Sequence, residues 1–424
     1  MGLPPWPDRK ASLHPFIFYE KKIKSVFCLA RPGAVAFHLL LQDRNMKKIR
    51  LVVLAALIGL LPVSAMAGTL RIGLMCPLTG GWASEGQDMQ HVVSLLVDEV
   101  NKAGGINGNK VQLVIEDDGS TPRSAATAAS RLVAADVCAA IAGVSAVIGT
   151  YGSAVTEAAQ NILDESEILH IATGATSVRL TEKGLEYFFR TSPRDDEQGK
   201  VAAQYIKDLG YKKIAIVHDN SSYSKGLAEE TRAGLEKEGV EIVFFDALTP
   251  KERDYSAILT KLRSADPDLF FYPGYYPEAG LLLRQKKEMG WDVPMMGGDS
   301  VNNADLVKIA GLSSCEGFLF FSPPVPADLT TEQGKAFMAA YTKAYETLPN
   351  SVWALLAGDA FNVLVEALRH TDGSSDAMAE YLKTGLKDYT GITGTFSFNA
   401  KGDRVGDLYQ LYQVTAEGEF KVKE

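Results

Sequence analysis

Ser153 is the residue whose neighbours most suggest chemistry, because it lies in the stretch GTYGSAVT at residues 149–156. An apolar run at 146–148 predicts a strand before this stretch, and residues 158–163 could be helical after it. A serine at such a junction can be a nucleophile, a helix cap or a ligand contact. The G-x-S-x-G pattern of a hydrolase nucleophile is absent here, because Ser153 is followed by alanine and valine.

A helix that starts just after Ser153 would leave its first backbone N–H groups without intrahelical partners. Together with the serine hydroxyl, such donors bind a carboxylate well. The stretch TGAT at 173–176 follows the next predicted strand and offers similar donors at Gly174 and Thr176. An ordinary cap or turn is the commoner role for either stretch alone. Because the two stretches end consecutive strands, we expect an anion site in which Ser153 both caps the helix and binds the carboxylate.

Asp299 offers the opposite chemistry, because an ionised carboxylate only accepts hydrogen bonds and can bind an ammonium group. It follows a predicted strand at 294–296. The alternative role, which the sequence leaves open, is to cap a helix near 304–309. Tyr223 and Tyr275 place aromatic rings at the ends of other strands, where they either contact a ligand or pack between lobes.

Patterns typical of enzymes and metal sites are absent from the sequence. Four histidines follow residue 67, and none belongs to an H-E-x-x-H pair. Neither a P-loop nor a G-x-G-x-x-G motif is present. The acidic run at 116–118 is more typical of a solvated turn or a helix cap than of paired acid–base groups. We therefore expect no enzymatic activity, no metal and no cofactor.

Strand-like and helix-like segments alternate from residue 70 onward, which predicts an α/β fold with doubly wound, mostly parallel sheets. The first ten predicted strands are 70–74, 111–116, 145–148, 168–172, 188–190, 213–218, 241–245, 269–272, 294–296 and 318–321, and two more are predicted at 395–399 and 407–414. The number of units predicts two similar Rossmann-like lobes rather than one sheet. Ligands of such sheets bind beyond the carboxyl ends of the strands, which is where the candidate residues lie.

Proline-containing segments at 190–196 and 323–326 suit crossovers between the lobes, because proline is excluded from central strands. A third crossing is expected near 401–405. Three short crossings would form a hinge that lets the lobes close on a ligand. The expected lobes are 68–193 plus 324–402 and 194–323 plus 403–424.

Residues 46–67 read MKKIRLVVLAALIGLLPVSAMA and have the three parts of a secretory signal peptide. A basic start precedes the apolar run at 51–61, and Ala-Met-Ala at 65–67 is the cleavage site. This run is too short to span a bilayer. We therefore expect Met46 to be the true start and residues 1–45 to be an upstream extension from a misassigned start. The alternative is a genuine N-terminal tail with a buried or signal-anchor helix.

Charge and cysteines narrow the class of protein further. Residues 1–67 hold 10 basic and 3 acidic side chains out of 43 and 52 in the whole chain, so residues 68–424 carry a net charge of −16. This charge argues against nucleic acid or an anionic membrane as partner. Cys76, Cys138 and Cys315 lack metal-type spacing, and we expect buried structural cysteines of which at least one is unpaired.

Four stretches read PLTGGWASEGQDM, NKAGGINGNKVQLVIEDD, IAIVHDNSSYSKGLAEETRAGL and FFYPGYYPEAGLLLRQ. In this order they resemble the periplasmic leucine/isoleucine/valine-binding protein family, the type I solute-binding proteins of ABC importers. The resemblance spans about 70–414 and implies two lobes that close around an α-amino acid. The site residues that it implies are Ser153 for the ligand carboxylate, Gly174 and Thr176 for further backbone and hydroxyl contacts, Tyr223 and Tyr275 in the second lobe, and Asp299 for the α-ammonium.

The chain departs from the family pattern at several of its matching positions. Asp299 stands where the family has a glutamate, so the ligand must sit closer or a water must bridge. Glu85 stands where the branched-chain binders have an aromatic residue beside the ligand side chain, which disfavours a purely apolar pocket. Trp82 is then the candidate for the apolar wall. Ser120 and Gly152 replace both halves of a disulfide found in the best-known members.

The resemblance implies a periplasmic amino-acid-binding protein that works as a monomer, takes a small-molecule ligand and delivers it to an ABC permease in the inner membrane. Two alternatives remain. The first is a non-amino-acid ligand such as an amide, a urea or an aromatic carboxylate, which would use Ser153 but leave Asp299 without a cation. The second is a sensor domain of the same fold. An α/β hydrolase is disfavoured because no credible triad accompanies Ser153.

Overall fold

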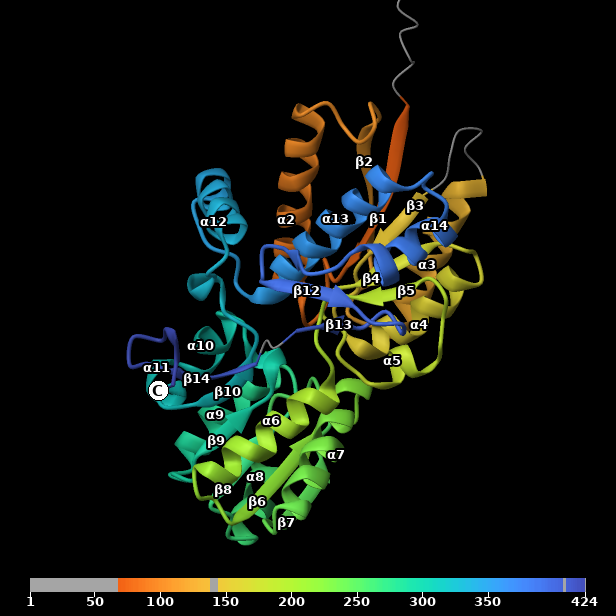
Figure 1. Ribbon diagram of the computed structural model, residues 1–424. Coiled ribbons are helices and arrows are strands. Elements are labelled where there is room, and N and C mark those ends of the chain that lie inside the picture. Colours follow the sequence, from red (N-terminus) through yellow and green to blue (C-terminus); the bar gives the residue numbers. More distant parts are fainter. Residues whose placement is uncertain (1–67, 138–143, 407–408, 424) are drawn as a thin grey trace, which may run out of the picture. The chain divides into compact units, whose positions relative to one another are not determined.

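The computed structural model describes residues 68–137, 144–406 and 409–423. The expected upstream extension, the signal peptide and Cys138 lie outside these residues. The described chain forms two sheets rich in parallel strands, with helices packed against them, and a small third sheet (Figure 1). The predicted α/β class is confirmed, and each of the first ten predicted strands is present with ends within two residues of those expected.

The first sheet has five parallel strands in the order β2-β1-β3-β4-β5. The strands are β1 (Thr69–Cys76), β2 (Lys110–Asp117), β3 (Val144–Ile148), β4 (Leu169–Ala172) and β5 (Phe188–Arg190). The helices between them are α2 (Ala83–Lys102), α3 (Pro122–Val137), α4 (Ser153–Asp164) and the short α5 (Arg179–Glu182). All four residues of β4 are buried, as expected for a parallel strand that is covered on both faces.

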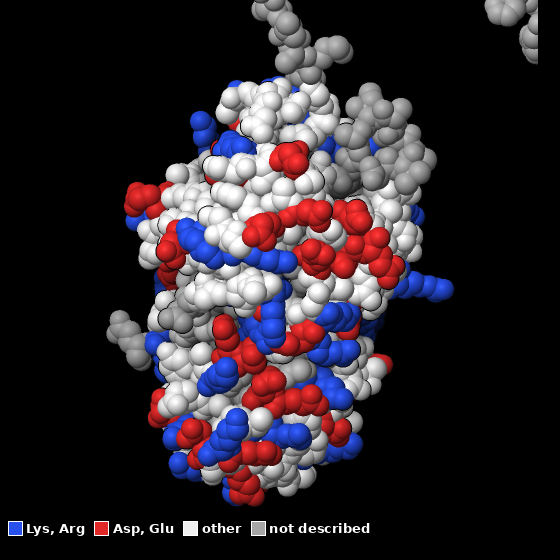
Figure 2. Space-filling model, turned by 45° about the vertical axis from the view of Figure 1, so that its right-hand side comes forward, with Lys and Arg blue, Asp and Glu red and all other residues white. Residues whose placement is uncertain are grey.

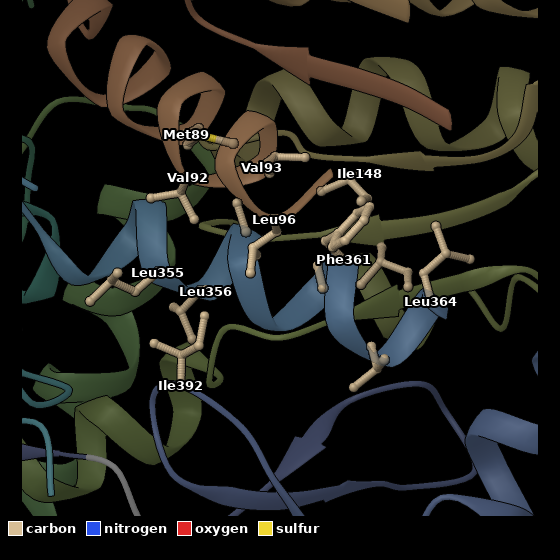
Figure 3. Packing of buried hydrophobic residues seen from close by; sticks show 14 of the residues in the cluster. Met89, Val92, Val93, Leu96, Ile148, Leu355, Leu356, Phe361, Leu364 and Ile392 are labelled. Carbon is tan, nitrogen blue, oxygen red and sulfur yellow. The ribbon is translucent and has the colours of Figure 1, made fainter. Parts of the chain in front are cut away.

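Helix α13 (Val352–His370) belongs to the core of this first lobe although it comes from a distant part of the chain. Fifteen of its 19 residues are buried, which explains why its sequence is apolar almost all round. Figure 3 shows side chains of α2, such as Met89 and Leu96, packed with those of α13, such as Phe361 and Leu364. The neighbouring elements are α12 (Glu332–Tyr345), α14 (Ser375–Glu380) and the small sheet of β11 (Tyr389–Thr390), β12 (Thr395–Phe398) and β13 (Arg404–Val405).

The second lobe is built on a seven-stranded sheet in the order β15-β14-β10-β9-β8-β6-β7. Its strands are β6 (Lys213–His218), β7 (Glu241–Ala247), β8 (Leu269–Tyr272), β9 (Met295–Gly297), β10 (Leu319–Ser322), β14 (Gln410–Val414) and β15 (Phe420–Val422). Its helices are α6 (Asp195–Asp208), α7 (Ser222–Lys237), α8 (Ser256–Ser264), α9 (Tyr276–Glu288), α10 (Asp305–Ala310) and α11 (Leu312–Cys315). The described pairs of this sheet are parallel except for β10 with β14 and β14 with β15, which are antiparallel.

The chain passes between the lobes three times, after β5, after β10 and between β13 and β14, which confirms the expected three-segment hinge. A buried ion cluster links the end of β5 and the start of the first crossing to the turn just before β13. Arg190 Nη2 lies 2.6 Å from Asp403 Oδ1, and Arg194 Nη1 lies 3.0 Å from Asp403 Oδ2. Arg190 and Asp403 are almost completely buried, so this cluster fixes the start of the first crossing against the chain just before β13 inside the protein.

The surface carries both signs of charge. Figure 2 shows lysine and arginine side chains intermingled with aspartate and glutamate on the face in view, a pattern typical of a solvated surface. Among the described residues, no helix combines the length and the apolar character that a membrane crossing requires.

Candidate functional site

Ser153 is the first residue of α4, and Gly152 occupies the N-cap position without a side-chain cap bond. The prediction that Ser153 caps this helix is therefore wrong, because the helix begins one residue earlier than expected. The Ser153 hydroxyl is buried and accepts a hydrogen bond from the Ser177 backbone N–H at 3.1 Å. Ser153 thus links the start of α4 to the loop that follows β4, where Gly174 and Thr176 lie.

The loop after β4 runs close to the residues before α4. The N–H groups of Thr173 and Gly174 both donate to the Thr150 carbonyl, each at 3.2 Å. A Cβ atom at Gly174 would lie 2.5 Å from a Tyr151 ring carbon, so only glycine fits there. Thr176 is fully buried, and its hydroxyl forms no hydrogen bond of ordinary length, although it lies near enough to the Asp195 carboxylate to lower the pKa of that group. A buried hydroxyl without such a bond beside a helix start is a group that a bound ligand can satisfy.

Asp299 lies at the start of a single 3-10 turn after β9 and is completely buried. Its Oδ1 accepts a hydrogen bond from the Tyr223 hydroxyl and its Oδ2 one from the Tyr409 hydroxyl, each at 2.9 Å. Burial raises the pKa of Asp299 to about 6, although these hydroxyl groups act to lower it. The alternative of a helix cap is wrong, because Asn303 Oδ1 accepts from the first N–H of α10, at Asp305.

Asp195, the first residue of α6, is a site candidate that the sequence analysis treated only as part of a crossover. It is fully buried, and neither carboxylate oxygen has a hydrogen-bond partner among the described residues. Its backbone N–H donates to the Thr176 carbonyl at 3.0 Å, which places it beside the loop after β4. Burial raises the pKa of Asp195 well above its ordinary value, and the Asp299 charge raises it further. Two buried carboxylates therefore repel each other here.

Four aromatic rings join the two lobes beside these polar groups. Trp82 and Tyr275 have ring centroids 4.4 Å apart, and Tyr223 and Tyr275 are 5.2 Å apart. Tyr151, which the sequence analysis did not select, lies 5.5 Å from Trp82 and 5.9 Å from Tyr275. Tyr223 and Tyr275 therefore pack between the lobes, and their rings also border the region that contains the buried polar groups.

Glu85 is completely buried near the start of α2. Its Oε1 accepts from Asn303 Nδ2 and its Oε2 from the Ser351 hydroxyl, each at 2.6 Å. Asn303 belongs to the second lobe and Ser351 caps α13 in the first, so the Glu85 carboxylate ties the lobes together. Both of its oxygens are thus already used by protein groups. Burial raises the pKa of Glu85 to about 8, opposed by these two hydrogen bonds.

This raised pKa predicts a pH dependence of stability. Between 4.5, the ordinary pKa, and about 8, the folded protein keeps a proton on Glu85 that the unfolded chain loses. The free energy of unfolding should therefore fall as pH rises through this range, by up to about 1.4 kcal/mol per pH unit from this group. Urea titrations at several pH values should show a shallower fall for Glu85→Gln. The exposed Glu99→Gln on the same helix serves as control, and parallel curves for all three proteins would contradict the assignment.

The structure also shows the state of the cysteines and of the possible metal ligands among the described residues. Cys76 and Cys315 are buried, as predicted, and both are free, a point that the sequence left open, while Cys138 lies outside the described residues. Among the residues that the structure describes, no group of three or more His, Cys, Asp or Glu side chains could hold a metal ion. Ser120, at one of the positions of the family disulfide, accepts a hydrogen bond from the Trp82 N–H at 3.3 Å.

Two lobes of parallel strands with three crossings, and polar residues gathered at the carboxyl ends of the strands, are the architecture of a protein that binds small solutes between its lobes. The chain belongs to the periplasmic binding protein family, whose model matches residues 69–419. The relationship suggested by the sequence is confirmed at the level of family and fold.

Two curated relatives and one solved structure are similar to this chain over most of its length. The chain is 33% identical to Leu/Ile/Val-binding protein homolog 3 of Brucella melitensis, over 87% of this chain and 97% of that protein. It is also 33% identical to the leucine-, isoleucine-, valine-, threonine-, and alanine-binding protein of Pseudomonas aeruginosa, over 86% of this chain and 95% of that protein. The structure of the substrate-binding protein LivJ from Streptococcus pneumoniae in complex with isoleucine superposes with a TM-score of 0.75 at 32% identity, over 84% of this chain and 98% of that one.

Proposed function

We propose that this chain captures an α-amino acid, branched-chain or related, between its two lobes and delivers it to an ABC permease in the inner membrane. The observation that carries the proposal is the pairing of opposite chemistries around one buried region. The start of α4 and the Thr176 hydroxyl supply donors, while Asp195 and Asp299 supply buried carboxylates. A zwitterion is the small molecule that satisfies both.

The carboxylate of the ligand would lie at the start of α4, on free backbone N–H groups and the hydroxyls of Ser153 and Thr176. Its ammonium would lie against Asp299 and Asp195, whose mutual repulsion a cation relieves. The two relatives that carry branched-chain names support this class of ligand. An aromatic acid or an amide would bring no cation to the two carboxylates, so the structure favours neither alternative.

The proposed function also includes export, a monomeric state and delivery of the ligand to the permease. Residues 46–67 would direct export and be removed, leaving a monomer that diffuses in the periplasm. The lobes would follow the expected 68–193 plus 324–402 and 194–323 plus 403–424, except that Arg404–Val405 stay with the first lobe, where β13 pairs with β12, and closure of the lobes on the ligand would be the signal to the permease. The protein would bind without chemical conversion and without a cofactor.

Isothermal titration calorimetry with isoleucine tests the proposal on the chain from Gly68 onward. We expect saturable one-to-one binding, and we expect Thr176→Val to weaken it by about tenfold, since one hydrogen bond to a charged group is lost. Thr342→Val, which removes a hydroxyl at an exposed position of α12, should leave the affinity unchanged. Binding of an aromatic acid in place of every amino acid would refute the zwitterion model.

A further inference from the structure

A pocket of about 440 Å³ opens between the lobes beside the proposed amino-acid site, with which it shares Trp82, Tyr275 and the first turn of α4. Its walls include Ala154 and Val155 from the first lobe and Pro250 and Leu281 from the second. Ser153, Thr176, Tyr223 and Asp299 are not part of its lining. The volume falls in the range of ordinary small-molecule sites, about 300–1,000 Å³.

Trp82 and Tyr275 separate the pocket from the amino-acid site. The Trp82 ring lies against Gly152, where a Cβ atom would come within 2.6 Å of a ring carbon, and it packs on Tyr275. Both rings also line the pocket. Apart from its charged residues, Gly81 and the two serines Ser120 and Ser221, the pocket is bounded by aromatic, aliphatic and proline side chains, which favours an apolar occupant.

The lining of this pocket also contains four charged side chains, of which two are buried carboxylates. Asp219 and Glu278 are buried, with 5% and 7% of their surface exposed, whereas Lys251 and Glu252 lie at the exposed rim. Asp219 Oδ1 accepts from the Ser221 N–H at 2.8 Å, and Glu278 Oε1 accepts from the Lys251 N–H at 3.1 Å. A carboxylate has about four acceptor positions, so each retains capacity for a further donor. With three carboxylates and one ammonium in the lining, an entering cation is favoured over an anion.

We propose that this pocket is a second binding site, for an apolar group that ends in an ammonium or guanidinium, with Asp219 and Glu278 as its charge partners. The apolar part lies along Trp82, Tyr275 and Leu281, and the cation replaces water at the two buried carboxylates. The aromatic faces of Trp82 and Tyr275 add attraction for the same charge.

The cation has two possible sources, which share this chemistry. A separate alkylamine fills the pocket independently of the amino-acid site. The side chain of a long basic amino acid reaches it when the head of that molecule is bound near Ser153, and this source alone rests on the proposed function. The two sources differ in their competition with isoleucine, which occupies the amino-acid site only.

Calorimetric titration of the chain from Gly68 onward with n-pentylamine, 1-pentanol and pentanoate tests the site, since the three probes share a chain length and differ in charge. We expect heat of binding from the amine at millimolar concentration and none from pentanoate. Repeating the amine titration in saturating isoleucine separates the sources, because a separate molecule binds undiminished. Lysine and norleucine form the second comparison, and the side-chain source makes lysine the tighter ligand.

The variant Glu278→Gln keeps an acceptor for the Lys251 N–H and removes the charge. It should weaken binding of the amine, or the advantage of lysine over norleucine, by about tenfold. The exposed Glu288→Gln at the other end of α9 is the matched control and should change neither. The site is overturned if pentanoate binds as well as the amine, if neither amine nor lysine shows binding, or if both variants behave as the native protein. Isoleucine binding measured in the same samples reports separately on the amino-acid site.

Discussion

Replacing Asp299 by alanine should weaken amino-acid binding by about 2–5 kcal/mol, the usual cost of removing one partner from a buried pair of charges. Asp299 is completely buried, and its two oxygens are oriented by the hydroxyls of Tyr223 and Tyr409. In the proposed binding mode, its truncation removes the charge opposite the ligand ammonium, and it leaves both hydroxyls without an acceptor. Calorimetry with isoleucine measures the loss as a drop in affinity.

A pH profile separates this electrostatic role from a structural one. The pKa of Asp299 is raised to about 6 in the ligand-free protein, and a cation favours the ionised form. Affinity of the native protein should therefore fall as pH drops below about 6, while Asp299→Asn should bind weakly at every pH. Asp292→Asn, at an exposed position of the same lobe, is the control. Native affinity in Asp299→Ala would show that no ammonium binds there.

The fold could be predicted from the sequence because its strands are short continuous apolar runs separated by helical patterns. Such runs specify where buried parallel strands lie, so the ends of β5, β6 and β8 coincide with those predicted. The start of α6 is harder to place from the sequence, because its polar first turn, Asp195–Gln198, carries no apolar periodicity. The order of strands in each sheet depends on contacts between distant segments and has no local signal.

The site could be predicted only in part, and the missing residues share a physical reason. Asp195, Tyr151 and Tyr409 lie on a crossover, in a loop and near the third crossing, where local patterns look like ordinary turns. Their roles arise from burial beside groups far away in the sequence, as when Tyr409 donates to Asp299. Glu85 is the opposite case. As a glutamate it suggested a polar contact with the ligand, whereas in the structure its carboxylate oxygens already accept hydrogen bonds from Asn303 and Ser351.

Arg190→Met should lower the free energy of unfolding by about 3–5 kcal/mol, the range found when one member of a buried ion pair is removed. The Arg190 guanidinium is fully buried and donates to Asp403, to the Thr181 hydroxyl at 2.8 Å and to the Ser177 carbonyl at 2.8 Å. Methionine fills much of the volume but leaves these acceptors without their donor. Urea titration monitored by tryptophan fluorescence measures the change.

The same substitution should also weaken amino-acid binding, because Arg190 joins the hinge to the loop that carries Thr176. Its Nη1 donates to the carbonyls on either side of that residue, at Ala175 and Ser177, while its Nε and Nη2 bind Asp403 just before β13. Arg179→Met is the matched control, since this side chain is 70% exposed and forms only a surface pair, and it should cost at most about 1 kcal/mol. Equal stability of the two variants would contradict this prediction, because it would mean that the ion pair with Arg194 alone stabilises the buried Asp403 carboxylate. If Arg190→Met loses stability but binds isoleucine with native affinity, the contacts of Arg190 with Asp403 do not affect the binding loop. If it loses both stability and affinity, Arg190 couples the hinge to that loop.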